Sequence, residues 1–78
     1  MTTYTNQYAQ KIYEIIYPVL GELMAKGSLR VHCNNLGITE NTIQQKDLKA
    51  ISERLRKGLI LFLGTEGAIQ TASKIEKL

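Results

Sequence analysis

The segment from residue 5 to residue 26 carries more hydrophobic surface than one face of a helix can hold. Its large apolar side chains recur at spacings of three and four, which predicts a single long helix. At about 100° per residue they cover roughly 220° of the circumference, against the ~100° stripe of an ordinary surface helix. The set is Ile12, Ile15, Ile16, Val19, Leu20, Leu23 and Met24, extended by Tyr4, Tyr8, Ala9, Tyr13 and Tyr17. Such a helix needs cover on more than one side.

The rest of the chain is short for that purpose. Its 78 residues make one small helical domain, 1–78, with a modest core. A domain of this size buries only about 60–65% of its unfolded surface. It is usually stabilised further by disulfides, by a structural metal ion or by oligomerisation. The single cysteine, Cys33, cannot form an internal disulfide, and no cysteine and histidine spacing suits structural zinc. We therefore expect a homo-oligomer.

Composition indicates a folded, soluble domain. The hydrophobic fraction of 44% and the charged fraction of 22% argue against disorder. No stretch approaches the ~18 apolar residues of a membrane span, and the first residues lack the pattern of a secretion signal. We therefore predict a cytoplasmic protein with no membrane partner. The net charge of +3 tilts only slightly toward polyanion partners.

Four helices are predicted, which makes the fold an all-α compact bundle. The first, residues 5–26, is long and kinked at Pro18, which lies opposite the apolar arc and removes a hydrogen bond to the carbonyl of Glu14. Gly27 ends this helix, and a short second helix follows. We expect that helix to stop at Gly37, which takes the left-handed conformation while Ile38 packs back.

The other two helices lie in the second half of the chain. The third begins beside Asp47, whose charge suits a helix N-terminus, and Gly64 ends it. Its predicted buried face is Leu48, Ile51, Leu55, Leu59, Phe62 and Leu63. The last helix, residues 66–77, has a face of small and aliphatic side chains: Ala68, Ala72, Ile75 and Leu78. No segment alternates with a period of two, so we expect no sheet.

Several apolar residues fall outside these faces, namely Val31, Ile60, Leu61 and Ile69. Together with the wide first helix, they predict an apolar surface that a monomer would leave exposed, and hence a homodimer. Tyrosine suits a half-buried interface because its ring is apolar and its hydroxyl remains wet. The predicted interface residues are Tyr13, Tyr17, Leu20, Met24, Ile60 and Leu61.

Residues with catalytic potential do not form a recognisable site. His32 and Cys33 are adjacent, so on a helix they project about 100° apart and cannot act as nucleophile and base. The seven acidic residues form no tight cluster that would bind Mg²⁺ or serve as an acid/base pair. The segment 64–67 has two glycines before a predicted helix, but it lacks the lysine of a phosphate-binding loop. We therefore expect no catalytic residue, no cofactor and no metal site, and a protein that is not an enzyme.

Residues 29–48 resemble a helix-turn-helix DNA-binding segment. The small residue Cys33 precedes the turn residue Gly37 by four, and residues 36–39 look like the characteristic turn. The resemblance implies that polar residues from Thr39 to Gln45 face the major groove. The apolar stripe that begins at Leu48 favours a loop over residues 39–45 instead.

Basic and polar residues outside this resemblance, as well as within it, are candidates for binding an anion or nucleic acid. The candidate contacts with an anion or nucleic acid are Arg30, Thr39, Thr42, Lys46, Lys49 and Arg56. Glu53 lies four residues from both Lys49 and Lys57, which is equally typical of an ordinary solvated face. The sequence thus predicts a non-catalytic interaction or regulatory module, with a small helix-turn-helix DNA-binding protein as the alternative.

Overall fold

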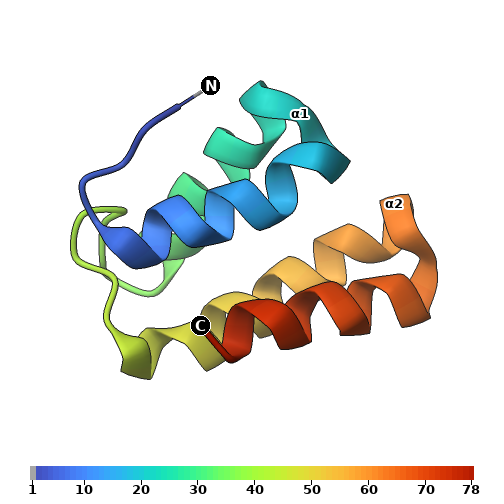
Figure 1. Ribbon diagram of the computed structural model, residues 1–78. Helices are drawn as coiled ribbons and strands as arrows, with labels where there is room; N and C mark the ends of the chain where they lie inside the picture. Colours follow the sequence, from blue (N-terminus) through green and yellow to red (C-terminus); the bar gives the residue numbers. More distant parts are fainter. Residues whose placement is uncertain (1) are drawn as a thin grey trace.

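Two long helices account for most of the chain. The computed structural model describes residues 2–78, in which helix α1 spans Gln7–Asn35, the 3₁₀ turn η1 spans Gln45–Asp47 and helix α2 spans Leu48–Glu76 (Figure 1). The described residues contain no strand. The predicted all-helical fold is therefore confirmed, whereas the prediction of four separate helices is wrong.

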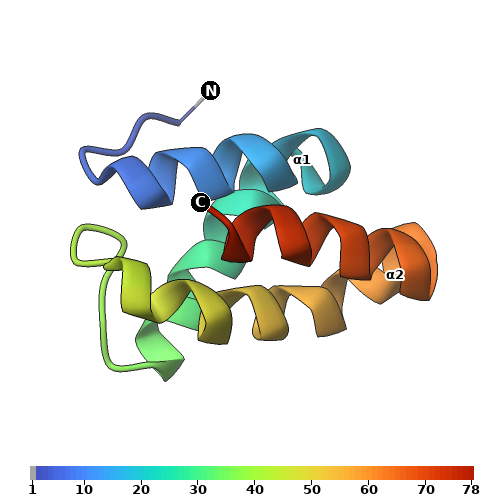
Figure 2. The ribbon, with the colours of Figure 1, turned by 60° about the horizontal axis from the view of Figure 1, so that its bottom comes forward.

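Each helix contains one glycine whose backbone is not helical. Gly21 in α1 has φ 79° and ψ 171°, and Gly64 in α2 has φ 73° and ψ 174°. This combination of angles is essentially restricted to glycine. Helical structure resumes at the next residue, so each helix doubles back on itself without a loop (Figure 1; Figure 2). We call the two halves arms: residues 7–20 and 22–35 in α1, and residues 48–63 and 65–76 in α2.

The first helix differs from its prediction in two ways. Its break is at Gly21 and not at Pro18, because a glycine with positive φ reverses the chain direction more sharply than a proline bend does. Pro18 is exposed, as predicted. The predicted end at Gly27 is also wrong, since Gly27 is helical and α1 continues to Asn35.

The C-terminus of α1 confirms the predicted stop signal. Gly37 has φ 75°, the Gly37 amide donates to the Asn34 carbonyl at 3.0 Å, and the Ile38 amide donates to the Cys33 carbonyl at 3.0 Å. These two bonds define a Schellman motif, which satisfies carbonyls that the helix end leaves free. Ile38 also packs against the core, as expected for the residue after such a glycine.

The core receives side chains from all four arms. Its buried residues are Ala9, Ile12, Tyr13, Ile16, Ala25, Leu29, Cys33, Ile43, Leu48, Ile51, Leu55, Leu59, Ala68, Ala72 and Ile75. The predicted small face of residues 66–77 is thus buried at three of its positions. Phe62 and Leu63, also predicted to be buried, are instead 48% and 37% exposed. They lie on the turn that follows Leu59, the last buried residue of the first α2 arm.

Asn6 joins the start of α1 to the loop between the helices. Its side-chain oxygen accepts a hydrogen bond from the Ala9 amide at 3.0 Å, and its Nδ2 donates to the Ile43 carbonyl at 3.0 Å. We expect Asn6→Ala to lower the free energy of unfolding by about 1–2 kcal/mol, because the helix loses its N-cap. Urea denaturation checks this value. Asn35→Ala, at an exposed position of the last turn, is the matched control and should change stability by less than about 0.5 kcal/mol.

Candidate interaction surface

An apolar groove runs between α1 and α2. One wall comes from α1: Leu20, the last residue of its first arm, and Met24, Ser28 and His32, which follow at spacings of four along its second arm. The other wall belongs to the first arm of α2: Leu55, Gly58, Leu59, Leu61 and Phe62. The groove has a volume of about 230 Å³. This is below the roughly 300–1,000 Å³ of typical small-molecule pockets, so its size suits one or two inserted side chains.

Both glycine breaks lie at the same end of the molecule (Figure 1; Figure 2), and residues near each break line the groove. The residues around them include the two most exposed large apolar side chains of the described residues, Leu61 at 89% and Leu23 at 84%, together with Met24 at 49% and Phe62 at 48%. Leu23 and Met24 follow Gly21, while Leu61 and Phe62 precede Gly64. The sharp turns therefore leave an apolar surface at this end that the chain itself does not cover.

The predicted interface residues divide between this groove and other places. Leu20, Met24 and Leu61 line it together, whereas Ile60 is half-buried against the core. Tyr13 is fully buried, so it is not accessible to a partner.

Three of the four tyrosines instead pack on one another near the start of the chain. The Tyr13 ring centroid lies 5.6 Å from that of Tyr4 and 5.5 Å from that of Tyr17. The Tyr13 hydroxyl accepts a hydrogen bond from the Thr2 amide at 3.2 Å. Tyr17 remains 37% exposed at the edge of this cluster.

Phe62 is the groove residue that sequence reasoning missed. Its spacing from Leu55 and Leu59 placed it on the predicted buried face. The signal that identifies it is the run of five apolar residues from Leu59 to Leu63. Such a run covers every side of a helix, so one core cannot bury all of it.

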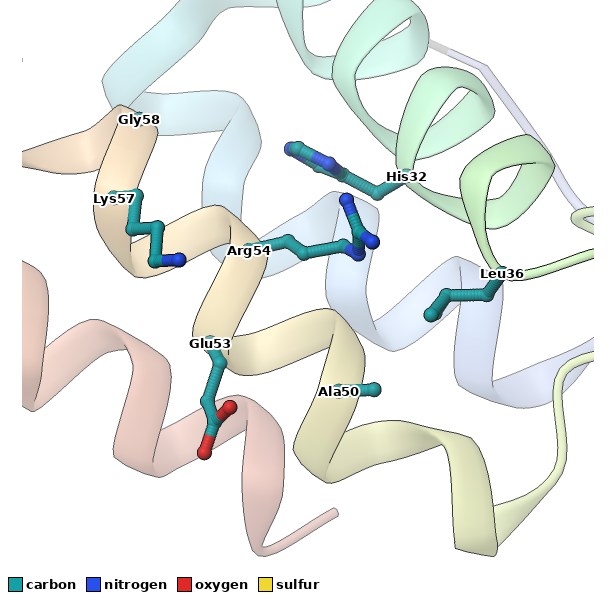
Figure 3. A pocket seen from close by; sticks show the side chains of 7 residues that line it. All are labelled: His32, Leu36, Ala50, Glu53, Arg54, Lys57 and Gly58. Atoms are coloured by element: carbon teal, nitrogen blue, oxygen red, sulfur yellow. The ribbon is translucent and has the colours of Figure 1, made fainter.

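A second, more polar hollow continues from the groove. The two share His32 and Gly58, and this basic hollow is also lined by Leu36, Ala50, Glu53, Arg54 and Lys57. Its volume is about 630 Å³. Figure 3 shows the Arg54 side chain reaching across from α2 toward His32 on α1, while Glu53 points away from both. The hollow therefore combines two cations and one imidazole with the carboxylate of Glu53.

The environments of His32 and Cys33 differ although the residues are adjacent. The Cys33 side chain is fully buried, and this burial, reinforced by the charges of Glu40 and Asp47, raises the pKa of its thiol to about 11. The thiol is thus protonated at neutral pH. Burial and then the positive charge of Arg54 lower the pKa of His32. The Nδ1 atom of His32 is buried without a hydrogen-bond partner among the described residues.

The candidate anion contacts are not gathered at one place. Arg30 lines a hollow beside Tyr4 and Leu23, and Arg56 lines another beside the last arm of α2. Lys46 and Lys49 are exposed near the start of α2. Arg54 and Lys57, which do share a hollow, were not among the candidates, because no sequence signal placed His32 opposite them.

Residues 38–44, within the helix-turn-helix resemblance, form a loop between α1 and η1. Thr39 and Thr42 close a turn there: the Thr39 amide donates to the Thr42 hydroxyl at 2.9 Å, and the Thr42 amide donates to the Thr39 carbonyl at 3.0 Å. The side chain and backbone of Thr42 are thus both used within the loop.

None of the helices within residues 2–78 has the length and apolar character that a membrane crossing requires. No group of three or more histidine, cysteine and acidic side chains is arranged to hold a metal ion in that part of the chain. The chain matches no protein-family model, no curated protein and no solved structure.

Proposed function

We propose that this protein is a non-catalytic, cytoplasmic interaction module that forms a homodimer through its apolar groove. The observation that carries the proposal is Leu61, which lies on the rim of the groove and is 89% exposed. In the dimer, Leu61 and Phe62 of one copy insert into the groove of the other. Burying a leucine side chain contributes about 1.5–3 kcal/mol, so a symmetric pair of such contacts supplies a substantial driving force.

The exposed apolar area supports an interface of ordinary size. Taking about 200 Å² for each large side chain, the exposed parts of Met24, Leu61 and Phe62, which line the groove, and of Leu63, which follows them, amount to roughly 450 Å². A standard interface buries about 800 Å² per partner, of which rather more than half is apolar. The surface also lies within the range of about 300–600 Å² for the largest apolar patch on a monomer, which is often functional.

A second copy of the chain is the partner that fits this arrangement. The protruding side chains and the groove that receives them belong to the same surface. A twofold interface needs that property, because each copy must present the same patch to the other. The groove is also small enough to be filled by the side chains that flank it.

Sedimentation equilibrium tests this proposal through Leu61→Glu. The wild-type chain should form dimers at micromolar to millimolar concentration, and the variant should weaken association at least ~10-fold, because each dimer would bury two carboxylates in apolar surroundings. Val31→Glu is the control: Val31 is 53% exposed but does not line the groove, so its dimer should persist. A monomeric wild-type chain, or a Leu61→Glu variant that dimerises normally, would contradict the proposal.

The same sedimentation runs examine DNA binding, the alternative that the helix-turn-helix resemblance implies. Random-sequence duplex DNA is added at low and high salt to the wild-type chain and to Lys46→Gln. Binding that weakens steeply with salt and with loss of Lys46 would favour the alternative, since phosphate contacts release counterions.

A further inference from the structure

The basic hollow is lined by two cations, Arg54 and Lys57, and by one carboxylate, Glu53. Arg54 and Lys57 lie three residues apart on α2, so they project from the same side of the helix. Within residues 2–78 neither has an ion-pair partner. Glu53, the carboxylate nearest in sequence, turns toward the other arm of α2, where it also lines a separate hollow (Figure 3).

His32 closes the hollow from the opposite helix. Figure 3 shows the Arg54 guanidinium extended toward its imidazole. The positive charge of Arg54 lowers the pKa of His32 further than burial alone does. The buried Nδ1 atom without a hydrogen-bond partner adds a second unfavourable feature. Arg54 and His32 thus approach each other with no carboxylate between them, and Lys57 lines the same hollow farther along α2 (Figure 3).

We propose that the basic hollow is a binding site for an anionic group, phosphate or carboxylate, held by Arg54, Lys57 and His32. Arginine presents a planar fork of donors that matches both kinds of anion, and lysine adds a mobile point charge. The imidazole then donates a third hydrogen bond once protonated. The volume of about 630 Å³ lies within the range of small-molecule sites, so the anion can belong to a larger molecule. This site does not depend on the proposed dimer.

Anion binding can be measured directly at His32, because it is the single histidine of the chain and its imidazole resonances are therefore unambiguous. The imidazole resonances are followed by NMR while inorganic phosphate replaces chloride at constant ionic strength, and acetate replaces it in a parallel titration. We expect saturable shifts and a higher pKa of His32 in the bound state, because an adjacent anion favours the imidazolium form. Saturation by phosphate alone, or by acetate alone, identifies which of the two anions the site takes.

Matched variants locate the site. Arg54→Gln/Lys57→Gln removes both cations of the hollow and should weaken binding at least ~10-fold. Lys46→Gln/Lys49→Gln removes the same charge near the start of α2, outside the hollow, and should leave binding unchanged. Because all four side chains are exposed, the variants should fold, which their thermal unfolding verifies.

Two outcomes would overturn the proposal: shifts that do not saturate with either anion, or equal weakening in both double variants. Repeating the titration with Leu61→Glu separates this site from the proposed dimer, since His32 also lines the apolar groove. Leu61→Glu should lose dimerisation and retain anion binding. A wild-type chain that binds the anion but stays monomeric would contradict the proposed function alone. A wild-type chain that dimerises but does not bind the anion would contradict the present proposal alone.

Discussion

Leu55→Ala is expected to remove about 2–5 kcal/mol of stability, the range for truncating a buried leucine. Leu55 is 2% exposed and belongs to the core cluster. A chain of this length has a total stability of roughly 4–12 kcal/mol, so the variant should be partly or wholly unfolded at moderate temperature. Urea denaturation at low protein concentration measures the loss without a contribution from self-association.

Leu61→Ala is the matched control, because it makes the same change on the same arm of α2. Leu61 is 89% exposed, so its truncation leaves no cavity and should change monomer stability by less than about 0.5 kcal/mol. Similar losses in both variants would show that the last turn before Gly64 is packed against something that the described fold does not contain.

The buried faces of the helices could be predicted because helical periodicity reports them directly. Ile12 and Ile16 in α1, and Ile51 and Leu55 in α2, repeat at the spacing that places them on one side. The stop at Gly37 was predictable for the same local reason, since the residues that cap a helix end are its neighbours in sequence.

The break in α2 was predicted at Gly64, where the structure has it, but the break in α1 was not predicted at Gly21. Pro18 is the conspicuous helix breaker of the chain, yet it lies within the first arm of α1, and the turn occurs three residues later at Gly21. A glycine permits a positive φ without requiring it. Gly27 is helical whereas Gly21 is not, and this choice depends on which geometry lets both arms bury their apolar faces.

The groove was anticipated only in part, because its two walls come from different helices. The excess apolar surface of residues 5–26 indicated exposed contacts, and Leu20, Met24 and Leu61 were named for that reason. Phe62 was missed because periodicity alone does not tell where a core ends along a helix. The pairing of His32 with Arg54 is a tertiary relation between residues 22 positions apart, and no local pattern reports it.

Alanine substitutions at Gly64 and Gly27 should change the free energy of unfolding in opposite directions. Gly64→Ala should lower the free energy of unfolding by about 1–3 kcal/mol, because φ 73° with ψ 174° is strained for any residue with a Cβ atom. Gly27→Ala should raise it by about 0.4–1 kcal/mol, because Gly27 is helical and alanine restricts the unfolded chain. An added Cβ meets no atom within 4 Å at either position, so backbone conformation alone separates the two variants.

Chemical denaturation measures the change in the free energy of unfolding for both variants. Small-angle scattering measures whether Gly64→Ala changes the shape of the molecule. The alanine favours a helix that continues straight through residue 64, and a straightened α2 would uncover Ala68, Ala72 and Ile75. Two chains can restore that burial by exchanging their last arms, so we expect the variant to form an extended, swapped dimer as its concentration rises. A compact Gly64→Ala monomer with wild-type stability would show that the turn at Gly64 is not required to bring the two arms of α2 together.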